Sequence, residues 1–345
     1  MNAAVDVDGL TSAWLTQALG REVLVGSCTA IGTGQTSASY RLEVSGEGLP
    51  STIVAKVGAG ADEARIRVRG GIRAEVGIYR EVISTVDVRA PQCWYAAASE
   101  DALRFTLLLE DLAPRVPGVQ ADGCTPAQAE ASVENLARLH APRWNDTSLL
   151  ELDYIRRSDP EGAAFLGNLS RSSAQAFTER YADALSDEDS ATLLSVGDKV
   201  GDWILARRTP FTLLHGDYRL DNLMFGIDED DVIAVDWQTV MIGPPTRDLA
   251  YFLGTSVDTA VRREVESELV ASYHRHLVAR GVDGYSFEQC FEDYRLGQLQ
   301  GPMITMIGST VATAERSDQA DRMFLAMARR SCAAIRDLGS LDLLA

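Results

Sequence analysis

Apolar residues follow two different periods along this chain, and the change between them predicts its architecture. A short helix is expected over residues 1 to about 20, where Leu10, Trp14 and Leu19 stand among polar neighbours. Strand-like runs follow at Glu22–Ile31, Ser37–Val44, Ser51–Val57 and Leu103–Leu109. Most of the remaining chain carries the period of amphipathic helices. The pattern predicts an α+β protein with a small β-rich N-terminal part and a larger, mainly helical C-terminal part.

Capping and turn signals place several elements of the helical part. Thr125–Gln128 has the order of a capping box with proline at the first helical position, and Ser286–Gln289 is a second capping box. An i, i+4 apolar stripe over residues 261–277 predicts a long helix. A β-hairpin is expected where Leu223–Phe225 pairs with Val232–Val235 across an acidic turn.

Charge and cysteine content limit the kinds of molecule that this protein is expected to bind. The 345 residues hold 32 basic and 50 acidic side chains, a formal charge of −18, which is unfavourable for binding a phosphate backbone and predicts no nucleic-acid partner. The five cysteines show no C-x-x-C spacing, so neither structural zinc nor a disulfide framework is expected. No basic signal-peptide start and no membrane-length apolar run are present, which predicts a cytoplasmic protein with no membrane partner.

The strongest chemical motif is His215-Gly216-Asp217-Tyr218-Arg219-Leu220-Asp221-Asn222, followed by Asp236 at the end of an apolar strand. Phosphoryl transfer needs a carboxylate to receive the acceptor's proton, and amide and carboxylate oxygens to hold Mg²⁺ on the nucleotide phosphates. The spacing therefore predicts Asp217 as the catalytic carboxylate and Asn222 and Asp236 as metal ligands.

Lysine is scarce in this chain. Only Lys56 and Lys199 occur, against thirty arginines. Ammonium is a compact point charge that the broad guanidinium fork does not copy, so a surviving lysine can mark a specific task. Lys56 lies in the strand-like run Ser51–Val57 and is expected to orient nucleotide phosphates, the alternative being a strand lysine that reaches solvent. Lys199 is expected on a solvated helix face.

A partner for Lys56 is expected shortly after it. The sequence predicts a Gly- and Arg-rich loop over Gly58–Gly71 and then a helix containing Glu75. Glu75 could hold the Lys56 ammonium toward the phosphates, because Ile78 and Tyr79 follow it at core-facing spacing. A solvated glutamate is the alternative interpretation, and Glu81 is a competing partner.

Two further segments are candidates for binding the nucleotide. Gly32 and Gly34 lie in a small-residue turn one strand before Lys56, where absent Cβ atoms would let backbone N–H groups approach phosphates; an ordinary hairpin turn is the alternative. The strand ending at Leu109 emerges into a proline-containing connector. The backbone groups of Glu110 and Leu112 in this connector are expected to face an adenine edge as a hinge.

Three other features have mainly structural interpretations. His140 is expected to be a buried structural histidine. Asp248 is expected to cap a helix and stabilise the catalytic loop rather than touch substrate. The segment Gln300–Met306, with one proline and two methionines, is either an adaptable substrate pocket or an ordinary core helix.

These residues resemble the aminoglycoside phosphotransferase-like family, small-molecule kinases related to protein kinases. The resemblance is carried mainly by His215–Asp217 with Asn222 and Asp236, and covers most of the chain, from the turn near Gly32 to residues 248–253. It implies a protein kinase-like two-lobed fold, with a nucleotide-binding lobe over residues 1–110 and a helical lobe with catalytic loop and substrate site over residues 111–345. It further implies ATP (or GTP) and Mg²⁺ as cofactors and a small-molecule hydroxyl as acceptor.

Departures from the protein-kinase pattern narrow the function. Trp237 and Gln238 follow Asp236 where a protein kinase has Phe and Gly, so conformational switching there is not expected. No long activation segment precedes Arg247, which argues against a peptide substrate. The Asp-Trp-Gln variant is similar to that of ecdysteroid kinase-like members, an argument against aminoglycosides as acceptor. The alternatives are a catalytically silent nucleotide-binding protein and a metal-dependent phosphohydrolase.

Overall fold

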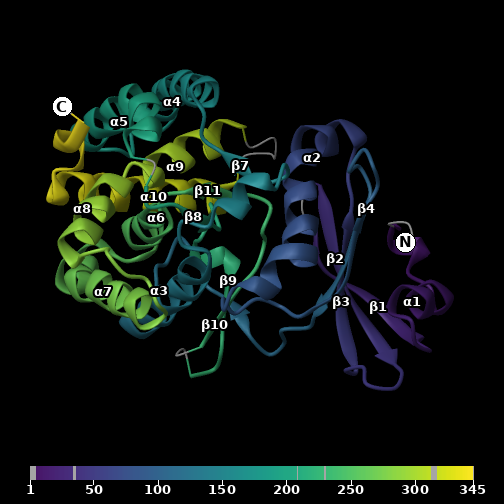
Figure 1. The fold of residues 1–345 in the computed structure, drawn as a ribbon. Helices are drawn as coiled ribbons and strands as arrows, with labels where there is room; N and C mark the ends of the chain where they lie inside the picture. Colours follow the sequence, from purple (N-terminus) through teal and green to yellow (C-terminus); the bar gives the residue numbers. More distant parts are fainter. Residues whose placement is uncertain (1–4, 34–35, 208, 229–230, 312–316, 345) are drawn as a thin grey trace. The chain divides into compact units, whose positions relative to one another are not determined.

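The computed structural model describes two compact units (Figure 1). Its described residues are 5–33, 36–207, 209–228, 231–311 and 317–344. The N-terminal unit consists of Met1–Thr85, Ala90–Pro114 and Val235–Val240. The C-terminal unit consists of Val86–Arg89, Arg115–Ala234 and Met241–Ala345. The short segment that contains Asp236 therefore packs with the N-terminal unit, although it follows most of the C-terminal unit in sequence.

The N-terminal unit is built on an antiparallel sheet of strand order β1-β2-β3-β5-β4. The strands are β1 (Leu24–Thr33), β2 (Ser37–Ser45), β3 (Thr52–Gly58), β4 (Cys93–Ala98) and β5 (Phe105–Glu110). Four of them match the strand-like runs of the sequence. The fifth strand, β4, was not predicted, because its sequence ends in three alanines and shows no alternation of apolar and polar positions. In the structure all of its residues have intermediate exposure.

Alternation along β3 determines which side chains reach each face of the sheet. Ile53, Ala55 and Val57 are buried in the core that also contains Leu15 of helix α1 (Ser12–Leu19). Successive strand residues point to opposite faces, so Lys56 projects from the other face. Helix α2 (Asp62–Gly77) lies on the opposite side of the sheet from α1 (Figure 1).

The expected loop over Gly58–Gly71 is wrong for most of its length, because α2 begins at Asp62. Two acidic residues in its first turn favour a helix start, and its arginines are good helix formers. The adjacent glycines Gly70 and Gly71 had indicated a loop, but packing explains the glycine at position 71. A Cβ added at Gly71 would lie 2.9 Å from the carbonyl oxygen of Gln238, so a close packing contact requires glycine inside this helix. A π-helical turn, Ile78–Val82, follows directly.

The C-terminal unit is mainly helical and contains a large apolar core from α4, α5, α9 and α10. Its helices are α3 (Pro126–His140), α4 (Pro160–Arg180), α5 (Asp187–Ala206), α6 (Thr246–Ser256), α7 (Thr259–Ala279), α8 (Phe287–Gly297), α9 (Gln300–Val311) and α10 (Asp318–Leu338). Thr125 forms the expected capping box with Gln128. At α8 the Ser286 side chain accepts from the Gln289 N–H, which is one of the two hydrogen bonds of the second expected capping box.

Short strands of the C-terminal unit flank the loop His215–Asn222, called the motif loop below. The expected hairpin forms between β9 (Leu223–Phe225) and β10 (Val232–Ala234), and β6 (Val116–Pro117) pairs with β9. On the other side, β8 (Thr212–Leu214) pairs with β11 (Met241–Gly243), which also pairs with β7 (Arg156–Arg157). The residues from His215 to Asn222 therefore leave one small sheet and enter another.

Candidate functional site

Lys56 and Glu75 form a close ion pair in the N-terminal unit. The ammonium nitrogen of Lys56 lies 2.7 Å and 2.8 Å from the two carboxylate oxygens of Glu75. Glu75 is 2% exposed and Glu81 is exposed, so the partner chosen from the sequence is the one present. Burial acts to lower the pKa of Lys56, but the carboxylates of Glu75 and Asp236 outweigh it and raise the pKa. The ammonium therefore stays charged.

Asp236 places a second carboxylate beside this ammonium. Its Oδ1 atom lies 3.5 Å from Nζ of Lys56, and 46% of its side chain is exposed. Its backbone has φ of +66°, a left-handed conformation that is uncommon outside glycine and often found at functional sites. Next to it, Trp237 is buried and the Gln238 amide donates to Glu75 Oε2 at 3.3 Å. The segment is thus packed in place, with one accessible carboxylate.

Asp217 and Asn222 are hydrogen-bonded to each other in the C-terminal unit. Asn222 lies in the 3₁₀ turn Leu220–Asn222, and its amide nitrogen donates to both the backbone oxygen and the Oδ2 atom of Asp217, each at 2.9 Å. Because both partners are acceptors, the amide must turn its nitrogen toward Asp217 and its oxygen away. That oxygen is the atom a hard cation such as Mg²⁺ would take.

Helix α6 holds the loop that carries Asp217. Asp248 accepts hydrogen bonds from the backbone N–H groups of His215 at 2.6 Å and Gly216 at 3.1 Å. Three residues further on, the hydroxyl of Tyr251 donates to Asp217 Oδ1 at 2.8 Å. The expected loop-stabilising role of Asp248 is confirmed, but it is not the helix cap, since Pro245 occupies that position.

A buried amide secures the next part of the same loop. Oε1 of Gln120 accepts from the N–H of Leu220 at 2.9 Å and from the Ser256 hydroxyl at 3.2 Å. Its backbone N–H donates to Asp221 at 3.0 Å, and its side-chain nitrogen donates to the Thr255 carbonyl at 3.0 Å. Gln120 was not singled out from the sequence, where a glutamine in a loop carries no signal.

Arg219 is the cation closest to Asp217 in sequence. Its Nε lies 3.3 Å from the Asp217 carboxylate, and it forms an ion pair with Asp221. Burial alone would lower the pKa of Arg219, but its interactions with Asp217, Tyr251 and Asp221 outweigh burial and raise the pKa. The guanidinium therefore stays charged. Neither Arg219 nor Tyr251 was predicted as a site residue. The spacing of Tyr251 from Asp248, three positions along one helix, is the signal that could have found it.

His140 is the buried structural histidine expected from the sequence. It is fully buried, its Nδ1 lies 2.7 Å from the Tyr273 hydroxyl, and its Nε2 lies 3.5 Å from Asp248 Oδ2. The histidine therefore packs beside Asp248, and its hydrogen bond goes to Tyr273 instead.

The glycine turn and the hinge are only partly described. Gly34 lies outside the described residues. Gly32 lies in β1, and a Cβ added there would have no described atom within 4 Å, so packing does not require glycine at this position. The N–H of Glu110 is occupied by the Gln92 carbonyl at 2.8 Å. Among the described residues, no hydrogen bond of the Leu112 backbone is present, and the hinge contact stays a prediction.

Two other expectations concerned single features of helices. Lys199 is not fully solvated: it is partly buried on α5, and its ammonium donates to the Leu344 carbonyl at 3.3 Å. Gln300–Met306 forms the start of α9, with Pro302 and Met306 buried. Met306 belongs to the apolar core, as the core-helix interpretation requires.

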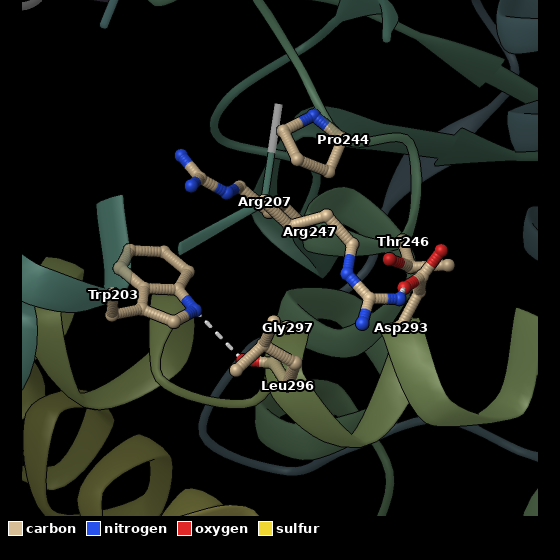
Figure 2. Close-up of a pocket in the computed structure, with 8 residues that line it drawn as sticks. All are labelled: Trp203, Arg207, Pro244, Thr246, Arg247, Asp293, Leu296 and Gly297. Carbon is tan, nitrogen blue, oxygen red and sulfur yellow. Dashed lines mark hydrogen bonds and ion pairs between the residues drawn. The ribbon is translucent and has the colours of Figure 1, made fainter. Parts of the chain in front are cut away.

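A separate pocket of the C-terminal unit contains none of the predicted site residues (Figure 2). It is lined by Trp203, Arg207, Pro244, Thr246, Arg247, Asp293, Leu296 and Gly297. The Arg247 guanidinium lies 4.2 Å from the centre of the Trp203 ring, and the indole N–H donates to the Leu296 carbonyl at 2.7 Å. Burial lowers the pKa of Arg247 to about 10. Arg247 also donates to the Ile204 carbonyl, so the pocket is part of the helical scaffold.

No helix in the described part of the chain is both long enough and apolar enough to cross a bilayer.

Comparison with solved structures identifies the fold. The GDP complex of wild-type aminoglycoside 2′-phosphotransferase-IIIa superimposes with a TM-score of 0.53 at 12% identity, over 89% of this chain and 93% of that one. Ethanolamine kinase from Plasmodium vivax superimposes with a TM-score of 0.50 at 14% identity, over 88% and 81%. The predicted fold, α+β and protein kinase-like with a β-rich and a mainly helical part, is confirmed.

Sequence comparison gives the family. Acyl-CoA dehydrogenase family member 10 of Mus musculus is 30% identical in an alignment of 216 positions that covers 54% of this chain but only 18% of that protein. The model of the ecdysteroid kinase-like family matches residues 76–281, more than half of the chain, including the whole motif loop and Asp236. The chain therefore belongs to the ecdysteroid kinase-like family of small-molecule kinases.

Proposed function

We propose that this protein transfers the γ-phosphoryl group of ATP (or GTP) to a hydroxyl group of a small molecule, with Mg²⁺. The observation that carries the proposal is the Lys56 ammonium, which is held by both oxygens of Glu75 beside the exposed carboxylate of Asp236. Nucleotide phosphates need a fixed cation and a metal-binding carboxylate, and this arrangement supplies both. Family membership and the kinase-like fold support the same conclusion.

In the proposed reaction, the acceptor oxygen forms a bond to the γ-phosphorus while the bond to the β,γ-bridging oxygen breaks, releasing ADP. Asp217 orients the acceptor hydroxyl and receives its proton, which then passes to solvent. Lys56 neutralises and orients the phosphates. We propose Gly32, Gly34, Glu110 and Leu112 as further nucleotide-binding positions.

The donor chemistry of Asn222 and Asp236 fits Mg²⁺. The Asn222 amide oxygen is turned away from Asp217, and the Asp236 carboxylate is accessible. Amide and carboxylate oxygens are ligands of this hard cation, which also keeps several waters. When bound, Mg²⁺ would neutralise charge on the phosphate oxygens.

We further propose that residues 1–110 bind the nucleotide and residues 111–345 supply the catalytic loop and the acceptor site. A cytoplasmic location is consistent with the five cysteines, which are all unpaired. The ethanolamine kinase and the aminoglycoside phosphotransferase act on small hydroxylated amines according to their names, which makes hydroxylated metabolites and antibiotics the first acceptors to test.

The test is a screen of such compounds with MgATP, in which the product is detected by the mass of one added phosphoryl group. Asp217→Asn should lower turnover by roughly 10²–10⁴-fold, the range typical of general-base residues, with nucleotide affinity little changed. A catalytically silent protein would bind MgATP but turn over neither acceptor nor water. Phosphate release from a phosphorylated compound without nucleotide would instead indicate a phosphohydrolase. Near-normal turnover of Asp217→Asn would remove Asp217 from the mechanism.

A further inference from the structure

We propose that Tyr251 is a positioning residue for this reaction. Its hydroxyl holds the Asp217 carboxylate in the orientation that receives the acceptor hydroxyl, and prevents the carboxylate from pairing fully with Arg219. The inference rests on the proposed function, because it assigns Tyr251 a task only if Asp217 acts in phosphoryl transfer.

The contact between the two side chains has a defined direction. Tyr251 is fully buried on α6, and its oxygen lies 2.8 Å from Asp217 Oδ1. Burial and the neighbouring Asp217 charge raise the pKa of Tyr251 well above the usual phenol value. The phenol therefore stays protonated and donates to the carboxylate, which only accepts.

A second donor acts on the other oxygen of the same carboxylate. The Asn222 amide donates to Oδ2 at 2.9 Å, from the 3₁₀ turn rather than from α6. Two donors from different elements thus hold the two oxygens of Asp217 and fix the rotation of the carboxylate plane. The Asp217 side chain keeps 24% of its surface exposed, so an acceptor hydroxyl can reach it.

Arg219 is the competitor that makes this restraint necessary. Its Nε already lies 3.3 Å from the carboxylate, and a guanidinium prefers to bind both oxygens of a carboxylate in parallel. If the Tyr251 hydroxyl were absent, Oδ1 would lose its donor. The carboxylate could then turn toward Arg219 and offer fewer lone pairs to the acceptor.

Other contacts of α6 would hold the loop backbone in place without Tyr251. Asp248 accepts from the N–H groups of His215 and Gly216. Gln120 joins Leu220 of the loop to Ser256 at the end of α6. Removing one hydroxyl should therefore change the orientation of the Asp217 side chain and leave the loop where it is.

The experiment compares Tyr251→Phe with Tyr294→Phe. Tyr294 is also fully buried in the C-terminal unit and donates to a carboxylate, Glu266 at 3.1 Å, that has no proposed role in catalysis. The probe is MgATP with water as acceptor, and the readout is released phosphate. Tyr251→Phe should lower kcat by roughly 10- to 100-fold, as expected when a reacting group is misplaced, while its KM for MgATP and its Tm match those of Tyr294→Phe.

A double-mutant cycle with Arg219→Gln tests whether Arg219 competes with the Tyr251 hydroxyl for the Asp217 carboxylate. It compares the effect of Tyr251→Phe in two backgrounds, so the result does not rest on a single variant. The loss of kcat caused by Tyr251→Phe should be smaller in the Arg219→Gln background, because the competing cation is absent. An equal loss in both backgrounds would overturn the competition.

The outcomes separate this inference from the proposed function. Normal kcat of Tyr251→Phe beside an inactive Asp217→Asn overturns the role of Tyr251 alone. The same is true if KM for MgATP rises with kcat unchanged. No nucleotide turnover by the parent protein, with water or with any screened acceptor, overturns the proposed function and the role of Tyr251 together. Full turnover by Asp217→Asn removes Asp217 from the mechanism, and the role of Tyr251 with it.

Discussion

Lys56 shows how the environment of a single residue gives an ordinary side chain a specific task. Its nitrogen lies within 3.5 Å of three carboxylate oxygens, two from Glu75 and one from Asp236. Only 13% of the side chain is exposed, so the ammonium is held rather than free to sample solvent. In a chain with thirty arginines, a lysine at this position is explained by the carboxylates of Glu75 and Asp236, which lie close to one nitrogen atom. A compact ammonium fits between them better than a planar guanidinium.

We expect Lys56→Arg to lower turnover by roughly 10²-fold, a loss typical of removing one electrostatic contact to the reacting group. The planar guanidinium keeps the charge but needs more room than the ammonium has between Glu75 and Asp236. Initial rates with MgATP measure the effect. Lys199→Arg is the matched control, because Lys199 donates to a single carbonyl at 3.3 Å and should tolerate the change.

The arginine variant is more informative than Lys56→Ala. Alanine would leave the buried Glu75 carboxylate without its partner, and breaking a buried pair in this way costs about 3–5 kcal/mol of unfolding free energy. Loss of activity would then be mixed with loss of stability. Full activity of Lys56→Arg would contradict the phosphate-orienting role, and the kinase proposal would then rest on the loop around Asp217.

Helix α2 shows where local sequence signals misled and why. Gly70 and Gly71 indicate a loop, yet both lie inside a helix that starts at Asp62. Only Gly71 has a packing reason, since its missing Cβ leaves space for the Gln238 carbonyl from a segment far along the chain. Such a contact is invisible to local propensity, because the approaching atom belongs to another part of the sequence.

We expect Gly71→Ala to destabilise the N-terminal unit by about 1–3 kcal/mol, the usual cost of overpacking, and to lower turnover by displacing the Asp236–Gln238 segment. Gly70→Ala is its neighbour control. A Cβ at Gly70 has no described atom within 4 Å, and alanine stabilises a helix interior by about 0.5–1 kcal/mol over glycine. Denaturant unfolding of both variants measures the difference. Equal stability of the two would show that the close contact carries no energetic cost.

The site could be predicted from sequence where the chemistry needs a particular residue type at a particular spacing. The pairing of Lys56 with Glu75 and the burial of His140 were expected from the sequence and are confirmed. The roles of Asp217 and Asn222 follow from such spacing and stay predictions. Tyr251 was not singled out, although it lies three positions after Asp248 on one helix, because a tyrosine in an apolar helix is ordinary until its hydroxyl is seen to meet a carboxylate.

For the chain taken together, the excess of acidic residues is offset locally by arginine. In the C-terminal unit, α7 and α10 are joined by Asp337, which accepts from Arg263 at 2.8 and 3.0 Å and also pairs with Arg262. Arg262 is only 1% exposed, so its guanidinium pairs with Asp337 and Glu266 rather than with water. Hydrogen bonds from Arg263 first, and then from Arg262, lower the pKa of Asp337. Carboxylates of this kind make the stability of the molecule depend on pH.

We expect Asp337→Asn to lower the free energy of unfolding by about 1.5–3 kcal/mol at pH 7, the value of hydrogen bonds between charged groups. Because the folded-state pKa of Asp337 is below the unfolded value of about 3.9, its contribution is fully present above that pH and is lost as the pH falls through the folded value. The Tm difference between parent and variant should therefore be constant from about pH 7 to 5 and shrink below about pH 4. Asp198→Asn, which removes an exposed pair with Arg171, should change stability by less than about 1 kcal/mol. A Tm difference for Asp337→Asn that persisted unchanged at the lowest pH would show that the carboxylate charge is not what holds α7 to α10.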